Sequence, residues 1–213
     1  MPLFRFISAA AAIGALALAG CGSSSSSGGG ASPVANSGVT GTSAGSSGGG
    51  PAALSGEANA ARTGDIPDTQ VFLVFANRAG GYSMKYPEGW TQKGSGQDLT
   101  FADKNNIVHV VISRGAAPTP ATVAAQLRTL RASSPALSFT APKTIQLPAG
   151  PAVGTTYTTQ SAPNAVTGKR VTLVVDRYQL HRGTTVATVD LGTPKGVDNV
   201  DAYKMMIRSF RWK

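Results

Sequence analysis

The chain has 213 residues, a formal net charge of +9 and one cysteine, Cys21. One cysteine cannot form an internal disulfide or a site made of several thiolates, so a folded domain in this chain must be held together by packing. Lys and Arg outnumber Asp and Glu by 19 to 10, and this imbalance favours association with anionic surfaces.

The first twenty residues are typical of a secretion signal. Arg5 supplies a positive charge, and residues 6–18 form a mostly apolar run. This run is shorter than the roughly 20 residues that a membrane-spanning helix needs. It ends in Leu18-Ala19-Gly20-Cys21, which matches a bacterial lipobox. We therefore predict a lipoprotein signal peptide over residues 1–20, acylation of Cys21, and a cell-membrane protein whose domain lies on the extracytoplasmic side. The alternative is an ordinary secretion signal with a chance cysteine.

Residues 21–68 have the composition of a tether. Gly, Ser, Ala, Thr and Asn dominate this segment, and large apolar residues are almost absent. Such a segment cannot bury enough surface to offset the entropy of ordering, so we expect a disordered linker. A Gly/Ser-rich coil of this length spans roughly 35–40 Å from end to end. Residues 41–45 match the G-x-S-x-G pattern of hydrolases, but no strand or helix is expected around them, so we interpret this as a chance match.

Residues 69–213 are expected to form one domain in which strand patterns dominate. Residues 82–86 alternate between apolar and polar side chains, and Pro87-Glu88-Gly89 then predicts a turn. Residues 103–106 join two further apolar runs into a hairpin. The expected strands cover residues 71–75, 82–86, 99–102, 107–113, 138–147, 152–160, 170–181 and 184–191.

Two helices are expected between and after these strands. The first has Thr119 as its N-cap and Pro120 at its first position. The second begins near residue 199, with acidic residues at its start and basic residues in its second half. The apolar faces are expected to consist of Val123, Leu127 and Leu130 in the first helix, and of Val200, Tyr203, Ile207 and Phe210 in the second. Strands grouped between helices indicate an α+β sandwich with an antiparallel sheet.

Residues 80–90 read Gly-Gly-Tyr-Ser-Met-Lys-Tyr-Pro-Glu-Gly-Trp. This segment resembles the opening motif of PsbP-like domains, G-[FY]-S-x-x-Y-P-x-G-W, and the order of elements over residues 71–213 agrees with that family. The resemblance implies an α/β/α sandwich whose central antiparallel sheet is flanked by helices. It also implies a non-enzymatic accessory or binding module, as in members that bind photosystem II and in eukaryotic relatives that bind the Ran GTPase. Many bacterial members are secreted proteins or lipoproteins. Tyr82, Tyr86 and Trp90 are expected to be core aromatics around a tight turn.

Catalysis has little support in the domain. We expect His109 to be a partly buried, hydrogen-bonded residue, because Ile107 and Val111 share its face of a strand. We expect His181 to be solvated near a strand end. An enzyme would need a pair such as His181 with Asp176, and the carboxylates are scattered singly. No cofactor motif or metal-ligand spacing is present, so we predict no catalytic residue, no metal and no cofactor.

Partners are expected in the envelope. From residue 69 onward, 17 Lys and Arg face 7 Asp and Glu, a balance of +10. Such a domain is attracted to anionic lipids or wall polymers, although the same charge is also compatible with a surface that only confers solubility. Nucleic acid is not expected, because export removes the domain from the cytoplasm and no recognition motif is present. The leading hypothesis is an adaptor that is anchored in the lipid bilayer through Cys21 and binds another envelope protein. The alternative is a carrier or sensor of a small or lipid-like ligand held between sheet and helix. The sequence does not indicate which residues would bind either one.

Overall fold

The structure is a computed structural model and describes residues 64–164 and 166–213. All of these belong to one compact unit. The predicted signal peptide, lipobox (Leu18, Ala19 and Gly20) and lipidation site (Cys21) lie outside the described residues, as does almost all of the predicted linker. The described fold begins at Gly64, a few residues before the start that we expected for the domain.

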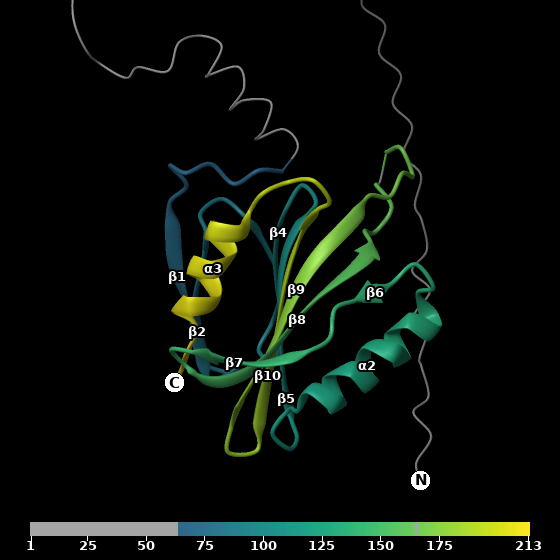
Figure 1. Ribbon diagram of the computed structural model, residues 1–213. Coiled ribbons are helices and arrows are strands. Elements are labelled where there is room, and N and C mark those ends of the chain that lie inside the picture. Colours follow the sequence, from purple (N-terminus) through teal and green to yellow (C-terminus); the bar gives the residue numbers. More distant parts are fainter. Residues whose placement is uncertain (1–63, 165) are drawn as a thin grey trace, which may run out of the picture. The chain divides into compact units, whose positions relative to one another are not determined.

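Strands make up most of the described fold, and two helices accompany them (Figure 1). The strands are β1 (Phe72–Asn77), β2 (Tyr82–Pro87), β3 (Thr91–Ser95), β4 (Asp98–Asp103), β5 (Asn106–Arg114), β6 (Ser138–Phe139), β7 (Lys143–Leu147), β8 (Gly150–Gln160), β9 (Thr172–Arg182), β10 (Thr185–Pro194) and β11 (Arg211–Trp212). The helices are α2 (Pro120–Ser133) and α3 (Val200–Ser209).

The strands form two sheets in which every pairing is antiparallel. The larger sheet has eight strands in the order β3-β4-β5-β10-β9-β8-β6, with β7 also paired to β8. The smaller sheet has the order β1-β2-β11. This arrangement confirms the predicted α+β class with antiparallel sheet and flanking helices.

The main core lies between the large sheet and the layer formed by the small sheet and α3. Alternate residues of β5, β10 and β4 point into it, because successive side chains of a strand face opposite sides. They meet Tyr82 and Met84 of β2 and the buried face of α3. The largest fully buried side chains of this core are Tyr82, Phe101, Phe210, Met84, Leu99, Leu180, Leu191 and Met206. Helix α2 packs on the opposite face of the large sheet, over a second apolar cluster.

Helix α2 begins as the sequence predicts. The Thr119 hydroxyl accepts a hydrogen bond from the Thr122 backbone N–H at 3.2 Å, and the Thr122 hydroxyl accepts one from the Thr119 N–H at 2.9 Å. This reciprocal capping box satisfies donors that the first turn leaves free. Val123 and Leu127 are buried as expected, but Leu130 is 39% exposed. The prediction that Leu130 belongs to the buried stripe was wrong, because this part of α2 borders an open groove.

Other elements differ from expectation in their extent. The predicted strand over residues 138–147 is two strands, β6 and β7, and the short strands β3 and β11 were not predicted. The buried side chains of α3 include Tyr203, Ile207 and Phe210, as expected. Met206 is also buried, although it was not expected to be, whereas Val200 is 51% exposed. Val200 is the first helical residue, at the open end of the sandwich, where no layer covers it.

Asn199 connects the first described residues to the rest of the fold. Its side chain accepts a hydrogen bond from the Ile66 backbone N–H at 2.8 Å and donates to the hydroxyl of Thr193 at 2.8 Å. It also donates to the carbonyl oxygen of Gly64 at 3.1 Å, an oxygen that accepts a second bond from Asn106. Asn106, Thr193 and Asn199 are all buried. A fully satisfied polar network of this kind fixes the start of the domain against β5, β10 and α3.

Candidate binding site beside helix α2

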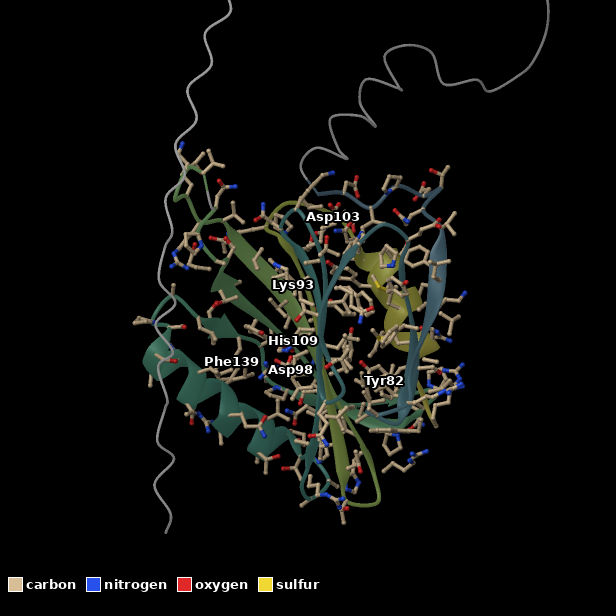
Figure 2. The ribbon with its side chains drawn as sticks, turned by 180° about the vertical axis from the view of Figure 1, so that it is seen from behind. Tyr82, Lys93, Asp98, Asp103, His109 and Phe139 are labelled. Carbon is tan, nitrogen blue, oxygen red and sulfur yellow. The ribbon has the colours of Figure 1, made fainter. Side chains whose placement is uncertain are left out.

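Helix α2 covers only part of its face of the large sheet. Its buried side chains pack over β8 and β9, in a cluster consisting of Val123, Leu127, Leu137, Val153, Tyr157, Leu173 and Val175. Phe139 packs against the same cluster, beside the helix (Figure 2). Strand β3 is exposed along its whole length, and on β5 every second residue is only half-buried. We call the face of the large sheet on which α2 packs the helix-side face. Beside α2, this face is therefore partly open.

A nearly buried ion pair lies at the centre of this face. The Arg177 guanidinium on β9 donates from Nε to Asp190 Oδ1 at 2.7 Å and from Nη2 to Asp190 Oδ2 at 2.6 Å. The two side chains are 12% and 11% exposed. They face each other because Arg177 and Asp190 are directly paired across β9 and β10. This parallel two-point geometry is the strongest form of such a pair.

Tyr157 on β8 completes the cluster. Its hydroxyl donates to Asp190 Oδ2 at 3.1 Å, and the Arg177 guanidinium carbon lies 5.1 Å from the centre of its ring. Burial raises the pKa of the Tyr157 hydroxyl, and the negative charge of Asp190 raises it further. Burial lowers the pKa of Arg177, but the hydrogen bonds to Asp190 and the charge of that carboxylate more than offset this, so the net shift is upward. Tyr157 therefore stays neutral and Arg177 stays charged over the physiological pH range.

A groove of about 670 Å³ lies between this cluster and α2. The side of α2 that lines it carries Thr122, Gln126, Thr129 and Leu130, and the sheet contributes Val111, Arg177, Gln179, Thr188 and Val186. Gln179 donates to Gln126 Oε1 at 2.7 Å and to the hydroxyl of Thr188 at 3.1 Å, which ties the helix to the floor of the groove. We call this space the α2 groove.

The α2 groove combines an apolar rim with fixed polar groups. Leu130 is exposed at its edge, and Val111 is half-buried on its floor. Arg177 Nη1 makes no hydrogen bond within the part of the chain that the structure describes, whereas Nε and Nη2 are both engaged. Apolar walls with a few fixed polar groups are the usual composition of a binding site. The groove is thus suited to an apolar group that carries a hydrogen-bond acceptor.

A second hollow, of about 180 Å³, lies on the other side of Tyr157 and Asp190. Its walls include Ile107, His109 and Ser161. The ion pair therefore lies between two openings on the same face of the sheet, with Arg177 lining one and Asp190 the other.

His109 lies further along the helix-side face and is partly buried, with a hydrogen-bond partner, as expected. Its Nε2 lies 2.8 Å from Asp98 Oδ1, and the two side chains are 35% and 74% exposed (Figure 2). In Figure 2, Lys93 of β3 lies between this pair and Asp103, the last residue of β4. A pair as exposed as this one contributes little to stability.

His181 and Asp176 do not form a site. They are an odd number of positions apart on the unbroken strand β9, so their side chains face opposite sides of the sheet. Asp176 accepts a hydrogen bond from the Thr156 hydroxyl at 2.6 Å. The expectation that His181 is solvated was wrong: it is half-buried, and its Nε2 is enclosed without a hydrogen-bond partner among the described residues. Residue spacing alone does not reveal that the neighbouring strands enclose this nitrogen.

Tyr82 and Trp90 are 1% and 8% exposed, as expected of core residues. Tyr86 is half-buried and stacks on Phe101, with ring centres 4.2 Å apart. In the described parts of the chain, no three His, Cys, Asp or Glu side chains are grouped so that they could hold a metal ion. Neither described helix is long and apolar enough to pass through a bilayer.

Sequence reasoning missed the residues that define the α2 groove. In the sequence, Arg177 is one basic residue among many, and Asp190 is one of the scattered carboxylates. The signal that could have found them is the tight loop at Gly183 and Thr184. Counting outward from it along both strands places Arg177 directly opposite Asp190.

No protein-family model matches the chain, and no curated protein sequence matches it. Among solved structures it is similar to the cyanobacterial PsbP (CyanoP) of Synechocystis, with 15% sequence identity and a TM-score of 0.46 over 71% of this chain and 99% of that one. It is also similar to the Ran-binding protein Mog1p of Saccharomyces cerevisiae, with 10% identity and a TM-score of 0.44 over 67% and 95% of the two chains. A protein of unknown function from Pseudomonas aeruginosa shares 19% identity, with a TM-score of 0.40 over 65% and 94%. The likeness in each case is one of fold.

Proposed function

We propose that this chain is a membrane-anchored envelope lipoprotein whose domain is a non-enzymatic adaptor that binds another envelope protein. Acyl chains on Cys21 would hold it in the bilayer, and residues 21–68 would let the domain search the surface around its anchor. Support for the anchor comes from Leu18-Ala19-Gly20-Cys21 at the end of a short apolar run. Two or more buried acyl chains give stable anchoring.

The observation that carries the binding role is the α2 groove. It places the exposed Leu130, the half-buried Val111 and the buried Val186 around a guanidinium that is already fixed by Asp190. A protein segment that inserts an apolar side chain there could also offer a backbone carbonyl to Arg177 Nη1. Preformed groups of this kind favour binding because little order is lost when the partner arrives. The same geometry disfavours Asp190 as a catalytic base, because both of its oxygens already accept hydrogen bonds.

A second candidate, a carrier or sensor of a small or lipid-like ligand, is favoured by the size of the groove. About 670 Å³ falls within the range of roughly 300–1,000 Å³ that is usual for ligand pockets. The two candidates differ in what remains bound after gentle isolation. A carrier retains a small molecule, whereas an adaptor retains a protein.

The proposal is tested by cross-linking in cells and mass spectrometry of the captured material. Four full-length chains are compared: the natural one, Cys21→Ala, Leu130→Asp, and Val166→Asp as the matched control. Val166 is also an exposed apolar residue, but it does not line the groove. The proposal predicts one dominant protein captured by the natural chain and by Val166→Asp, and lost with Cys21→Ala and Leu130→Asp.

Equal capture by Leu130→Asp and the natural chain would exclude the groove as the binding site. Capture of only lipid or wall fragments would favour the second candidate. Unchanged membrane retention of Cys21→Ala would contradict the anchor.

A further inference from the structure

A further pocket, of about 360 Å³, opens at one end of the sandwich, between the two sheets. Its walls come from separate connections: the β1–β2 turn, the β3–β4 turn, the end of β5 and the β9–β10 hairpin. Each contributes polar groups, and three of these are the arginines Arg78, Arg114 and Arg182. We call this the arginine pocket. It adjoins the α2 groove at Ser113 and Arg114, which line both, but its other lining residues are different, and its proposed role does not rest on the function proposed for that groove.

The strand register brings two of the arginines together. Arg114 of β5 is paired with Thr185 of β10, which is paired with Arg182 of β9. Alternation places both arginines on the sheet face that looks toward the small sheet. Arg78 comes from the β1–β2 turn of that small sheet. All three are exposed, so the guanidinium groups surround one opening from both layers of the sandwich.

These charges are not neutralised by neighbouring carboxylates. Asp and Glu are absent from the lining of the pocket. Within residues 64–164 and 166–213, the side chains of Arg78 and Arg114 make no ion pair or hydrogen bond. Arg182 donates to the carbonyl oxygen of Lys213 and lies over the ring of Trp212 at 5.2 Å. Asp98, the first residue of β4, follows Gln97, but it contacts His109 on the opposite face of the sheet.

The opposite end of the domain carries the opposite charge. Four carboxylates surround a hollow where the chain enters the fold and α3 begins, namely Asp65, Asp68, Asp198 and Asp201. In Figure 1 the start of α3 lies in the upper part of the described domain and the β9–β10 hairpin at its bottom. Such a polarity directs an approaching anion to the arginine end and away from the end at which the chain enters.

We propose that the arginine pocket binds a phosphate group of an envelope component, presented as a monoester or a diester. A guanidinium presents a planar fork of N–H donors that matches two phosphate oxygens. The hydroxyl of Thr185, which also lines the pocket, adds a further donor. A pocket of this size admits the phosphate together with the small organic group esterified to it. The phosphate belongs either to a soluble ester or to a lipid headgroup.

Binding measurements on the full-length Cys21→Ala chain test this proposal, because removing the predicted anchor lets vesicle binding report on the domain. The soluble probe is glycerol 3-phosphate. The surface probe is a phosphatidylcholine vesicle with or without phosphatidylglycerol. The test variant carries Arg78→Gln and Arg182→Gln, two arginines that line the arginine pocket but not the α2 groove. The matched control carries Arg128→Gln and Arg131→Gln, two exposed arginines of α2 that do not line the pocket.

The proposal predicts that the test variant weakens binding at least about tenfold, as expected for the loss of charge-assisted hydrogen bonds, and that the control changes it little. Binding of glycerol 3-phosphate would show that a soluble phosphate ester is sufficient to occupy the pocket. Binding only to vesicles that contain phosphatidylglycerol identifies the lipid headgroup. Equal weakening by both variants would show a general charge effect and overturn the proposal, as would the absence of binding to either probe. Circular dichroism checks that both variants remain folded.

Discussion

Asp190 accepts two hydrogen bonds from Arg177 at a place on the sheet where both side chains are nearly buried. Changing Asp190 to Asn keeps the shape but leaves the guanidinium charge without its counter-ion. Breaking such a pair costs about 3 kcal/mol of unfolding free energy. Asp98→Asn breaks the exposed pair with His109 and is expected to cost less than about 1 kcal/mol. Urea denaturation of the two variants checks this difference, and equal losses would show that the buried pair adds no more to stability than the exposed one.

Two buried tyrosines, Tyr157 and Tyr203, and the half-buried Tyr178 predict how stability depends on pH. Burial raises the pKa of Tyr157 and Tyr203, and it raises that of Tyr178 to about 12, with the charge of Asp176 adding to it. In the unfolded chain these hydroxyls ionise near pH 10, so above that pH the unfolded state binds fewer protons than the folded state. The stabilising contribution is therefore complete below about pH 10 and is lost as the pH rises through the raised values.

Tyr203→Phe tests this dependence. The hydroxyl of Tyr203 donates to the Gly192 carbonyl at 2.6 Å, so its removal costs about 1 kcal/mol at neutral pH. The variant lacks one raised pKa, so its unfolding free energy should fall less steeply than that of the natural chain between about pH 9 and pH 11. Denaturation curves across that range measure both slopes. Parallel slopes would show that Tyr203 ionises normally in the folded state.

At the scale of elements, helix α2 stabilises the domain through only part of its apolar face. Leu127 is fully buried, whereas Leu130 is 39% exposed beside the groove. Leu127→Ala is expected to cost about 3 kcal/mol, and Leu130→Ala less than about 1 kcal/mol. Thermal or urea unfolding of the two variants gives the comparison. A large loss with Leu130→Ala would mean that the groove closes over this residue in solution.

The strand and helix patterns predicted most of these elements, because alternation and capping are local properties. The hairpin around residues 103–106 and the Thr119 cap are found where expected. The strands β3 and β11 were missed because Thr91–Ser95 is polar and exposed, and Arg211–Trp212 is too short to show a period. Leu130 was misplaced because helix periodicity indicates which residues share a face, but not how far the opposing sheet extends. The α2 groove exists for the same reason, so its presence could not be read from the sequence.

At the scale of the whole molecule, Asn199 joins the entry of the chain to β5, β10 and α3. Asn199→Ala would leave several buried groups without partners, at a cost of about 2 kcal/mol. It should also release residues 64–68, because the Ile66 N–H and the Gly64 carbonyl both lose a bond. The Ile66 amide hydrogen would then exchange faster than in the natural chain. Exchange in β9 would rise only by the amount that the loss of overall stability accounts for. Unchanged protection at Ile66 would show that this segment is held by other contacts.

If the α2 groove receives a partner protein, a light-activated cross-linker placed at two neighbouring positions of α2 should reveal it. Thr129 lines the groove, and Arg128 is exposed but does not line it. With the full-length chain in cells, we expect one discrete cross-linked protein from position 129 and none from position 128. The same cross-linked products from both positions, or none from either, would contradict a partner in the groove.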